Sequence, residues 1–163
     1  IVGSMHCYRG LDMYEPTTYE GVTKDQAVGY YLEDSIKCLD MEPNFDTYGH
    51  IDYICRYWPY EDKNLHYSEH ADLWDEVFRR LIAQDKTIEI NTRRLQVPGA
   101  VETLTELYMR YKELGGKYVT LGSDAHVTKA IGANFAAAEK MAADCGLKIV
   151  YYKRRQRHLC EAE

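Results

Sequence analysis

The sequence predicts an α/β fold in which parallel strands alternate with helices, as in a β/α barrel. Three apolar segments each run into a histidine, at His6, His50 and His126. The segments between them carry apolar side chains at the spacing of amphipathic helices. Parallel strands end at one edge of their sheet, so such a fold would gather the three histidines in one region.

The first three elements, two strands with a helix between them, can be placed from the residues at their ends. The opening segment Ile1–His6 is expected to be a strand. A helix is expected over residues 23–41, because Thr23 and Gln26 have the spacing of a capping box and apolar residues then recur at helical intervals. Pro43 prevents this helix from continuing, and a strand over residues 45–51 is predicted to follow.

A second helix is predicted to start at Ser68 as its cap. Its apolar face consists of Ala71, Trp74, Val77, Phe78, Leu81 and Ile82. The run 87–91 then alternates, with Ile88 and Ile90 on one face and Glu89 and Asn91 on the other, which is typical of a strand.

Proline and glycine residues, which interrupt helices and strands, divide the remainder of the chain into separate elements. After Pro98-Gly99, apolar residues from Val101 to Leu114 predict a third helix, which Gly115-Gly116 ends. Three further elements are expected, a strand over 118–123, an alanine-rich helix over 133–145 and a strand over 147–152. The basic tail 153–158 is expected to be a solvated, fraying end rather than a binding patch.

Asp124 and His126 stand two residues apart after the strand 118–123. Side chains at positions i and i+2 of an extended segment share a face, so we expect both groups to reach one site. A single histidine at a strand end is more often structural than a ligand, but three of them together with Asp124 favour a metal site. Imidazoles with a carboxylate suit Zn, Fe or Mn better than Ca or Mg, and such ions support phosphomonoester hydrolysis.

The same segments resemble, in order and spacing, the motifs of the PHP superfamily, and most closely its histidinol-phosphate phosphatase subgroup. The matching segments are Gly3-Ser4-Met5-His6, Gly49-His50-Ile51-Asp52-Tyr53-Ile54-Cys55-Arg56-Tyr57, Glu89-Ile90-Asn91-Thr92 and Gly122-Ser123-Asp124-Ala125-His126. The resemblance implies that residues 1–163 form one partial domain, the C-terminal part of a distorted parallel (β/α)7 barrel. The family's His-x-His strand, a further histidine and a bridging glutamate have no counterpart in this sequence.

The resemblance also implies metal ligands and an activity. His6 and His50 would hold one ion, Asp124 a second and His126 a third, each shared with residues outside this sequence. Two or three divalent ions are implied, most of all Zn, with Fe or Mn as alternatives. The intact protein would hydrolyse L-histidinol phosphate to L-histidinol and phosphate in histidine biosynthesis. The isolated chain is then expected to bind metal poorly and to be inactive.

Substrate contacts are expected from the loops beside these ligands. Arg56 would present its planar guanidinium to the substrate phosphate, unless it forms a surface ion pair with Glu61. Tyr57 would line the pocket, and Glu15 or Asp12 would face the cationic end of histidinol phosphate. Alternative functions are a PHP phosphoesterase of another small phosphorylated metabolite or nucleotide, and a non-catalytic remnant that acts as an assembly partner.

Two arginines differ from the family pattern, and two further histidines lie outside the matching segments. Arg93-Arg94 replaces the small residues that the family resemblance would place after Asn91. His66 and His70 are four residues apart and would chelate a metal on a helix, but with a helix cap between them they are interpreted as surface residues.

Composition limits the remaining possibilities. The formal net charge of −6 argues against a nucleic-acid-binding surface. The five cysteines include no C-x-x-C pair, so reduced cysteines in a cytoplasmic protein are expected. No apolar stretch is long enough to predict a membrane span, and no membrane partner is expected. Exposed edges of an open sheet would allow a homo-oligomer.

Overall fold

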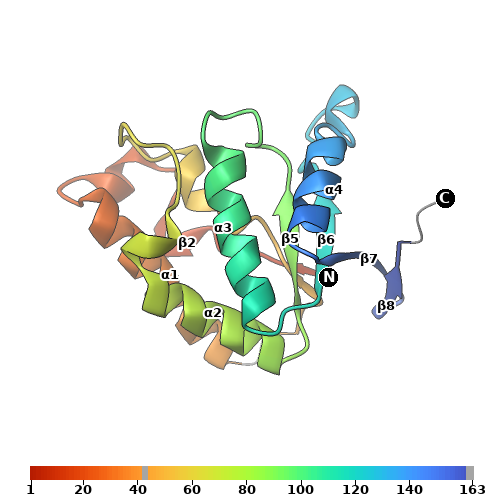
Figure 1. Ribbon diagram of the computed structural model, residues 1–163. Coiled ribbons are helices and arrows are strands. Elements are labelled where there is room, and N and C mark those ends of the chain that lie inside the picture. The colour runs from red at the N-terminus through yellow and green to blue at the C-terminus, as the bar shows by residue number, and fades with distance from the viewer. Residues whose placement is uncertain (42–43, 161–163) are drawn as a thin grey trace.

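The computed structural model describes residues 1–41 and 44–160 and shows a sheet with helices packed along one face (Figure 1). The strands are β1 Val2–Gly3, β4 Thr47–Tyr48, β5 Thr87–Asn91, β6 Tyr118–Gly122, β7 Lys148–Lys153 and β8 Gln156–Leu159, with a separate hairpin of β2 Cys7–Tyr8 and β3 Leu11–Asp12. The α-helices are α1 Lys24–Asp40, α2 Ala71–Ala83, α3 Ala100–Glu113 and α4 Phe135–Asp144. Short 3-10 helices are η1 Pro16–Tyr19, η2 Tyr53–Arg56, η3 Tyr67–Glu69 and η4 Thr128–Ala130.

The strands lie in the order β1-β4-β5-β6-β7-β8, which follows their order in the chain. Each neighbouring pair from β1 to β7 is parallel, and only β8 is antiparallel to its neighbour. Right-handed crossovers in a sheet of this order place every intervening helix on the same face. The predicted α/β class with a parallel sheet is therefore confirmed, and β1 and β8 form the two edges of a sheet that is not closed into a barrel.

The register of β5 separates an apolar face of the sheet from a polar one. Ile88 and Ile90 are fully buried in the core. Glu89 and Asn91 face the other way and pair in register with Thr120 and Gly122 of β6. The alternation read from the sequence thus predicted this strand correctly, with the same first and last residues.

The first helix has the predicted start. The Thr23 hydroxyl accepts a hydrogen bond from the backbone N–H of Gln26, and the Gln26 side chain accepts one from the N–H of Thr23. This capping box satisfies two amide groups that an isolated helix end would leave without partners. Pro43 lies outside the described residues.

Three predicted boundaries are wrong. The opening strand expected over Ile1–His6 spans only Val2–Gly3. The strand expected over residues 45–51 is reduced to Thr47–Tyr48, since His50 has a positive φ of 24° that an extended strand cannot accommodate. Ser68 does not cap the second helix but lies inside η3, and α2 begins after His70 with no side-chain cap.

The basic tail is also not a fraying end. Residues 156–159 form β8, which pairs with β7 across a two-residue turn in which Arg154 and Arg155 have positive φ values of 51° and 65°. Such a turn matches the twist of a hairpin. Arg155 forms an ion pair with Asp46, and Arg157 forms one with Asp85. The tail therefore ties the last hairpin to the start of β4 and to the residues before β5.

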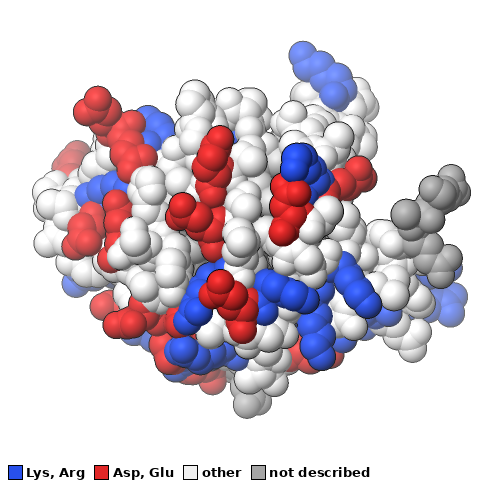
Figure 2. Space-filling view, in the orientation of Figure 1, with Lys and Arg blue, Asp and Glu red and all other residues white. Residues whose placement is uncertain are grey.

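Charges of both signs are interspersed over the face shown in Figure 2. Basic side chains gather along its lower edge, where α2 and α3 end, and the last turns of these helices contain Arg80, Arg110 and Lys112. Cations at helix C-termini are stabilising. Within the described residues, no helix has the length and apolar character needed to cross a membrane. All five cysteines are free thiols.

Candidate metal centre

The carboxyl ends of neighbouring strands bring the predicted site residues to one edge of the sheet. His6 follows β1, His50 follows β4, and Asp124 follows β6, each by two or three residues. These strands lie side by side with β5 between β4 and β6. The loops after parallel strands are where α/β folds place their functional groups.

The two histidine rings face each other. His6 Nε2 lies 3.3 Å from His50 Nε2, and the rings are nearly parallel at 17°. A tetrahedral zinc ion with Zn–N distances of about 2.0–2.1 Å holds two imidazole nitrogens about 3.3–3.4 Å apart. The spacing of the two ring nitrogens therefore fits a shared divalent ion.

The protonation state of His50 suits a ligand. Burial, together with the nearby Arg56 guanidinium, lowers the pKa of His50 to about 4. A neutral imidazole has one nitrogen with a free lone pair, which is the form that binds metals. Its Nδ1 is buried and has no hydrogen-bond partner among the described residues. Tyr53 stacks on the His6 ring, with 4.3 Å between ring centroids, and packs at a tilt against the His50 ring at 4.9 Å, and so restricts their orientation.

Asp124 lies in a basic environment. Its Oδ2 forms an ion pair with Arg56 and lies 3.6 Å from Arg93 Nη1. Burial raises the pKa of Asp124, but the Arg56 guanidinium outweighs burial and holds it below the usual range. The carboxylate is therefore ionised, with one oxygen committed to Arg56.

His126 does not share a face with Asp124 in the way that an extended segment would require. Asp124 has a positive φ of 49°, and the His126 side chain is 70% exposed. The extended conformation expected at Asp124 is therefore wrong, but the two side chains still lie together, with His126 Nδ1 3.8 Å from Asp124 Oδ1 and both residues in the wall of one cavity. His126 Nδ1 also lies 2.8 Å from the carbonyl oxygen of Asp124 and 3.1 Å from Arg93 Nη1. The two contacts need different tautomers, because a guanidinium can only donate. With the proton on Nδ1, this nitrogen donates to the Asp124 carbonyl and Nε2 keeps its lone pair for a ligand, whereas with the proton on Nε2, Nδ1 accepts from Arg93.

A hydrogen-bond network on β5 connects these groups. Glu89 Oε2 accepts from the backbone N–H of His50 at 2.8 Å and from Asn91 Nδ2 at 3.0 Å. Asn91 Oδ1 in turn accepts from Arg56 Nη2 at 3.3 Å. The alternation of polar and apolar residues in β5 put Glu89 and Asn91 on the face of the site, but it gave no indication of their partners.

The three residues predicted to contact the substrate, Arg56, Tyr57 and Glu15, have different neighbours in the structure. Arg56 pairs with Asp124, so the alternative of an ion pair with Glu61 is wrong. Tyr57 packs against Tyr53 and against Tyr14 from the loop after β3. That loop contains Glu15, whose exposed side chain has no hydrogen bond or ion pair to the histidines or to Arg56 among the contacts of the described residues.

Two open cavities meet at Arg93. One of about 440 Å³ is lined by Arg93, Asp124 and His126, together with Thr92, Gln96 and Asn134. The other, of about 290 Å³, contains Arg56, Tyr57, Lys63 and Arg94 in its wall beside Arg93. The basic walls favour an anionic group next to Asp124 and the histidines. Arg93 was not predicted to contribute to the site, because the sequence gave only its departure from the expected small residue.

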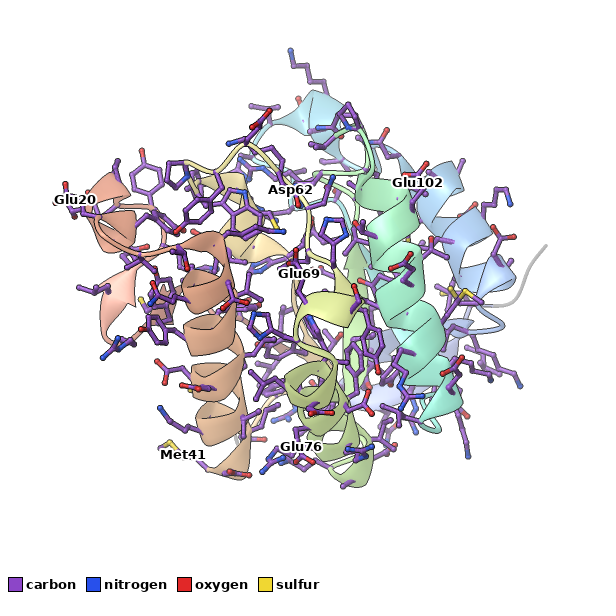
Figure 3. The ribbon with its side chains drawn as sticks, turned by 60° about the vertical axis from the view of Figure 1, so that its left-hand side comes forward. Glu20, Met41, Asp62, Glu69, Glu76 and Glu102 are labelled. Carbon is purple, nitrogen blue, oxygen red and sulfur yellow. The ribbon has the colours of Figure 1, made fainter. Side chains whose placement is uncertain are left out.

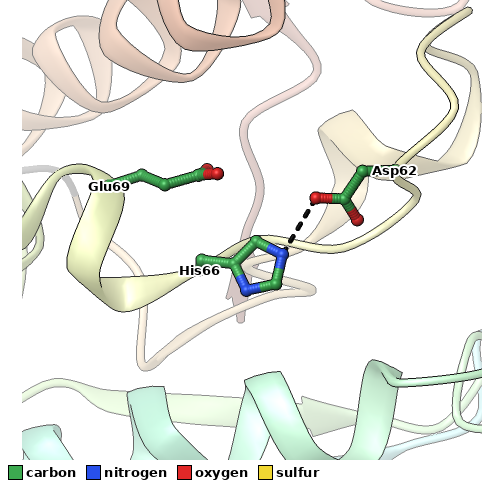
Figure 4. Close-up of side chains that lie close together, drawn as sticks. All are labelled: Asp62, His66 and Glu69. Carbon is green, nitrogen blue, oxygen red and sulfur yellow. Dashed lines mark hydrogen bonds and ion pairs between the residues drawn. The ribbon is translucent and has the colours of Figure 1, made fainter.

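A second group of side chains of the types that can ligate metals lies apart from these residues. Asp62, His66 and Glu69 bring their ligand atoms within 4.8 Å of one another (Figures 3 and 4). The ammonium group of Lys24 already binds this group, at 2.7 Å from Asp62 and 2.9 Å from Glu69. His66 also contacts Asp62 at 2.9 Å. An amine therefore occupies the position that a cation would take.

The curated proteins that this chain resembles are named histidinol-phosphatases. No family model matches the chain. The protein named "Probable histidinol-phosphatase" from Clostridium acetobutylicum is 43% identical over 155 residues, which is 95% of this chain and 61% of that protein. A histidinol-phosphatase from Lactococcus lactis is 36% identical over 133 residues, 79% of this chain and 48% of that protein.

A solved structure has the same fold. It is the crystal structure of the Lactococcus lactis histidinol phosphate phosphatase in complex with Zn, L-histidinol and phosphate, with a TM-score of 0.90 and 28% identity. The match covers 96% of this chain and 60% of the other. The chain thus spans at most 61% of the length of these relatives.

Proposed function

This chain is homologous to the histidinol-phosphatases over nearly its whole length, and from this premise we propose that it forms part of a metal-dependent phosphatase of L-histidinol phosphate. The products would be L-histidinol and phosphate, the two molecules bound with Zn in the related Lactococcus structure. The single observation that carries the proposal in this chain is the 3.3 Å spacing of His6 Nε2 and His50 Nε2. It fits two ligands of one zinc ion.

The other proposed ligands are Asp124 and His126. Arg56 holds Asp124 Oδ2, which leaves Oδ1 as the carboxylate oxygen for an ion. His126 would use Nε2, since Nδ1 faces the Asp124 carbonyl oxygen. We expect two or three ions in the intact protein, with Zn favoured and Fe or Mn as alternatives. When bound, such ions polarise a phosphoryl group and bring the pKa of a coordinated water to about 7.

The residues of the chain would bind and orient the substrate. Arg56 lies in the wall of the cavity beside Arg93, where its guanidinium would approach a phosphate oxygen. Its Nε is buried and has no hydrogen-bond partner in the described part of the chain. Tyr57 would line the same side of the site, next to the loop that contains Tyr14. Glu15 lies one residue further along that loop and would approach the cationic end of the substrate.

The proposal is tested by phosphate release from L-histidinol phosphate in the protein that carries this chain, with bound zinc measured on the same samples. His50→Ala should remove activity and at least one zinc ion per chain. His66→Ala is the matched control, because its ring belongs to the separate group held by Lys24, and it should leave both quantities unchanged. If His66→Ala lost zinc and His50→Ala did not, the metal centre would be assigned to the wrong histidines.

The same assay separates the alternatives. Faster release from another phosphorylated metabolite or a nucleotide would make the protein a phosphoesterase of different specificity. Loss of all release, with zinc bound and the fold intact, would support a non-catalytic role as an assembly partner.

A further inference from the structure

We propose that Glu89 is a positioning residue that fixes the backbone of His50 and, through Asn91, the side chain of Arg56. The inference rests on the proposed function in one respect, namely that His50 and Asp124 are metal ligands. It assigns a role to a residue that is itself neither a ligand nor a base. The hydrogen-bond network around β5 carries the inference.

Glu89 is a buried acid without a cation beside it. It is 8% exposed, and the ion pairs of the described residues include none to Glu89. Burying a carboxylate in this way is costly, and a leucine or methionine at this position would not incur that cost. The hydrogen bonds that its oxygen accepts offset this cost. Oε2 receives both the His50 N–H and the Asn91 amide.

The first of these bonds acts on a strained residue. His50 has φ of 24°, in the left-handed region that non-glycine residues rarely adopt. Such conformations cost about 1–3 kcal/mol and persist where their surroundings hold them. The bond from His50 N–H to Glu89 fixes the peptide group before the ring. The position of Nε2 opposite His6 depends on that peptide group.

The second bond extends to the other half of the site. Asn91 donates to Glu89 through Nδ2, so its Oδ1 is turned toward Arg56 Nη2 at 3.3 Å. Arg56 in turn pairs with Asp124. One carboxylate oxygen on β5 therefore connects the residues that follow β4 with the residue that follows β6.

Gly122 makes room for this arrangement. A Cβ atom at this position would lie 1.9 Å from Glu89 Oε1, a distance that would force the carboxylate to move. Gly122 pairs in register with Asn91 on the adjacent strand. Gly122→Ala should therefore displace Glu89 without altering any hydrogen-bonding group of the network.

If Glu89 acts by accepting hydrogen bonds, replacing it with glutamine and replacing it with leucine should have different effects. Glu89→Gln keeps a carbonyl oxygen that can accept both bonds, whereas Glu89→Leu keeps the size but accepts neither. A positioning role predicts that Gln preserves the site and Leu does not. A ligand or general base would fail with either substitution, because both remove the ionised carboxylate.

The first experiment needs no metal. Hydrogen exchange of the His50 amide is followed by NMR in the metal-free chain, for the wild type, Glu89→Gln, Glu89→Leu and Gly122→Ala. Protection should be retained in Glu89→Gln and fall at least tenfold in the other two. Glu102→Leu is the control, since Glu102 lies on the first turn of α3, exposed and away from the sheet (Figure 3). Equal protection of His50 in the wild type and in Gly122→Ala would overturn the inference, even if Glu89→Leu failed to fold.

The second experiment tests the consequence for metal binding. Co²⁺ is titrated into the same variants made in the protein that carries this chain, because the isolated chain is expected to bind metal poorly, and the absorption spectrum is recorded. Loss of a partner that orients a ligand typically costs 10–100-fold in metal affinity, so Glu89→Leu and Gly122→Ala should bind Co²⁺ at least tenfold more weakly than the wild type and Glu89→Gln. Glu89→Gln binding as weakly as Glu89→Leu would contradict positioning and assign a ligand role. Absence of Co²⁺ binding by the wild type would count against the proposed function, while the exchange experiment would still decide the role of Glu89.

Discussion

At the scale of single residues, the site depends on backbone conformations that most side chains avoid. His50 and Asp124 both have positive φ, at 24° and 49°. Each lies two residues after the end of a strand, where the chain turns away from the sheet. In this conformation the Asp124 carboxylate meets Arg56 and Arg93, and the His50 ring faces His6.

Arg56 is expected to contribute more to substrate binding than to metal binding. Arg56→Ala should raise KM for L-histidinol phosphate about 10–100-fold, since charge-assisted hydrogen bonds contribute about 1.5–3 kcal/mol. Arg56→Lys should restore little, because an ammonium group cannot make the planar contact of a guanidinium. Steady-state kinetics with zinc analysis checks this. A loss of zinc in Arg56→Ala with an unchanged KM would restrict Arg56 to orienting Asp124.

Arg94 is expected to stabilise the fold rather than the substrate complex. It is buried and donates to Asp52 Oδ2 at 2.8 Å and to the carbonyl oxygen of Lys63. Arg94→Met would leave the Asp52 carboxylate buried without its partner, which typically costs about 3–5 kcal/mol. Urea unfolding measures the difference. Arg79→Met, which removes an exposed arginine, should cost less than about 1 kcal/mol, and equal costs for the two variants would disprove the structural role of Arg94.

At the scale of elements, Lys24 connects the start of α1 to the segment that contains η3. Burial raises the pKa of Asp62, but the Lys24 ammonium and the Asn64 N–H outweigh it and lower the pKa to about 2. A lowered pKa in the folded state contributes stability above the unfolded value near 3.9, and this contribution is lost as pH falls toward 2.

Lys24→Met should therefore destabilise the protein by about 0.5–1 kcal/mol at pH 7, a small value because Asp62 and Glu69 are partly exposed. The difference from the wild type should shrink between pH 4 and pH 2. Urea unfolding at pH 7, 4 and 2.5 tests this, with Lys140→Met on α4 as a surface control. A difference that grows on acidification would show the wrong sign for this ion pair.

The β7–β8 hairpin is expected to protect one edge of the sheet. Removal of residues 154–163 would expose β7 and take away the arginine partners of Asp46 and Asp85, while the Ile1 ammonium group would stay beside Asp46. The four paired positions of this ladder indicate a loss on the order of 2 kcal/mol or more. Light scattering should show self-association through the exposed edge. Arg155→Gln, which keeps β8, should remain as monodisperse as the wild type, and a truncated chain with unchanged stability and mass would refute the role of the hairpin.

The elements that could be predicted were those with a local signal. Thr23 and Gln26 fixed the start of α1, and the alternation in β5 fixed that strand. β8 was missed because its turn uses Arg154 and Arg155 at positive φ, where the sequence pattern leads one to expect Gly or Asn. Ser68 was misassigned because a serine in η3 has the same local context as a cap.

At the scale of the whole molecule, the site is non-local, which is why only part of it could be predicted. The strand ends gave His6, His50 and Asp124, because each follows its own apolar segment. Their connections through Glu89, Asn91 and Arg93 come from strands and loops more than thirty residues away in the chain. No local spacing encodes such contacts. The order of parallel strands was required to bring them together.

The open sheet has a consequence for assembly. β1 and β8 lie at its edges, and Ile1, Val2 and Leu159 are exposed there. Apolar side chains on unpaired strand edges favour association with another strand. Because the β7–β8 hairpin protects the other edge, we expect partners to dock along β1 rather than at the helices, whose surfaces carry mixed charge.

The measurement that tests the central claim most directly is a zinc titration followed by ¹⁵N NMR of the histidine side chains. The Nε2 resonances of His6 and His50 should shift together, at the same ratio of zinc to protein, because their 3.3 Å spacing fits a single ion. His66 and His70 should not respond at that ratio. A response of His6 without His50, or of His66 before either, would contradict the assignment of the metal centre to the ends of β1 and β4.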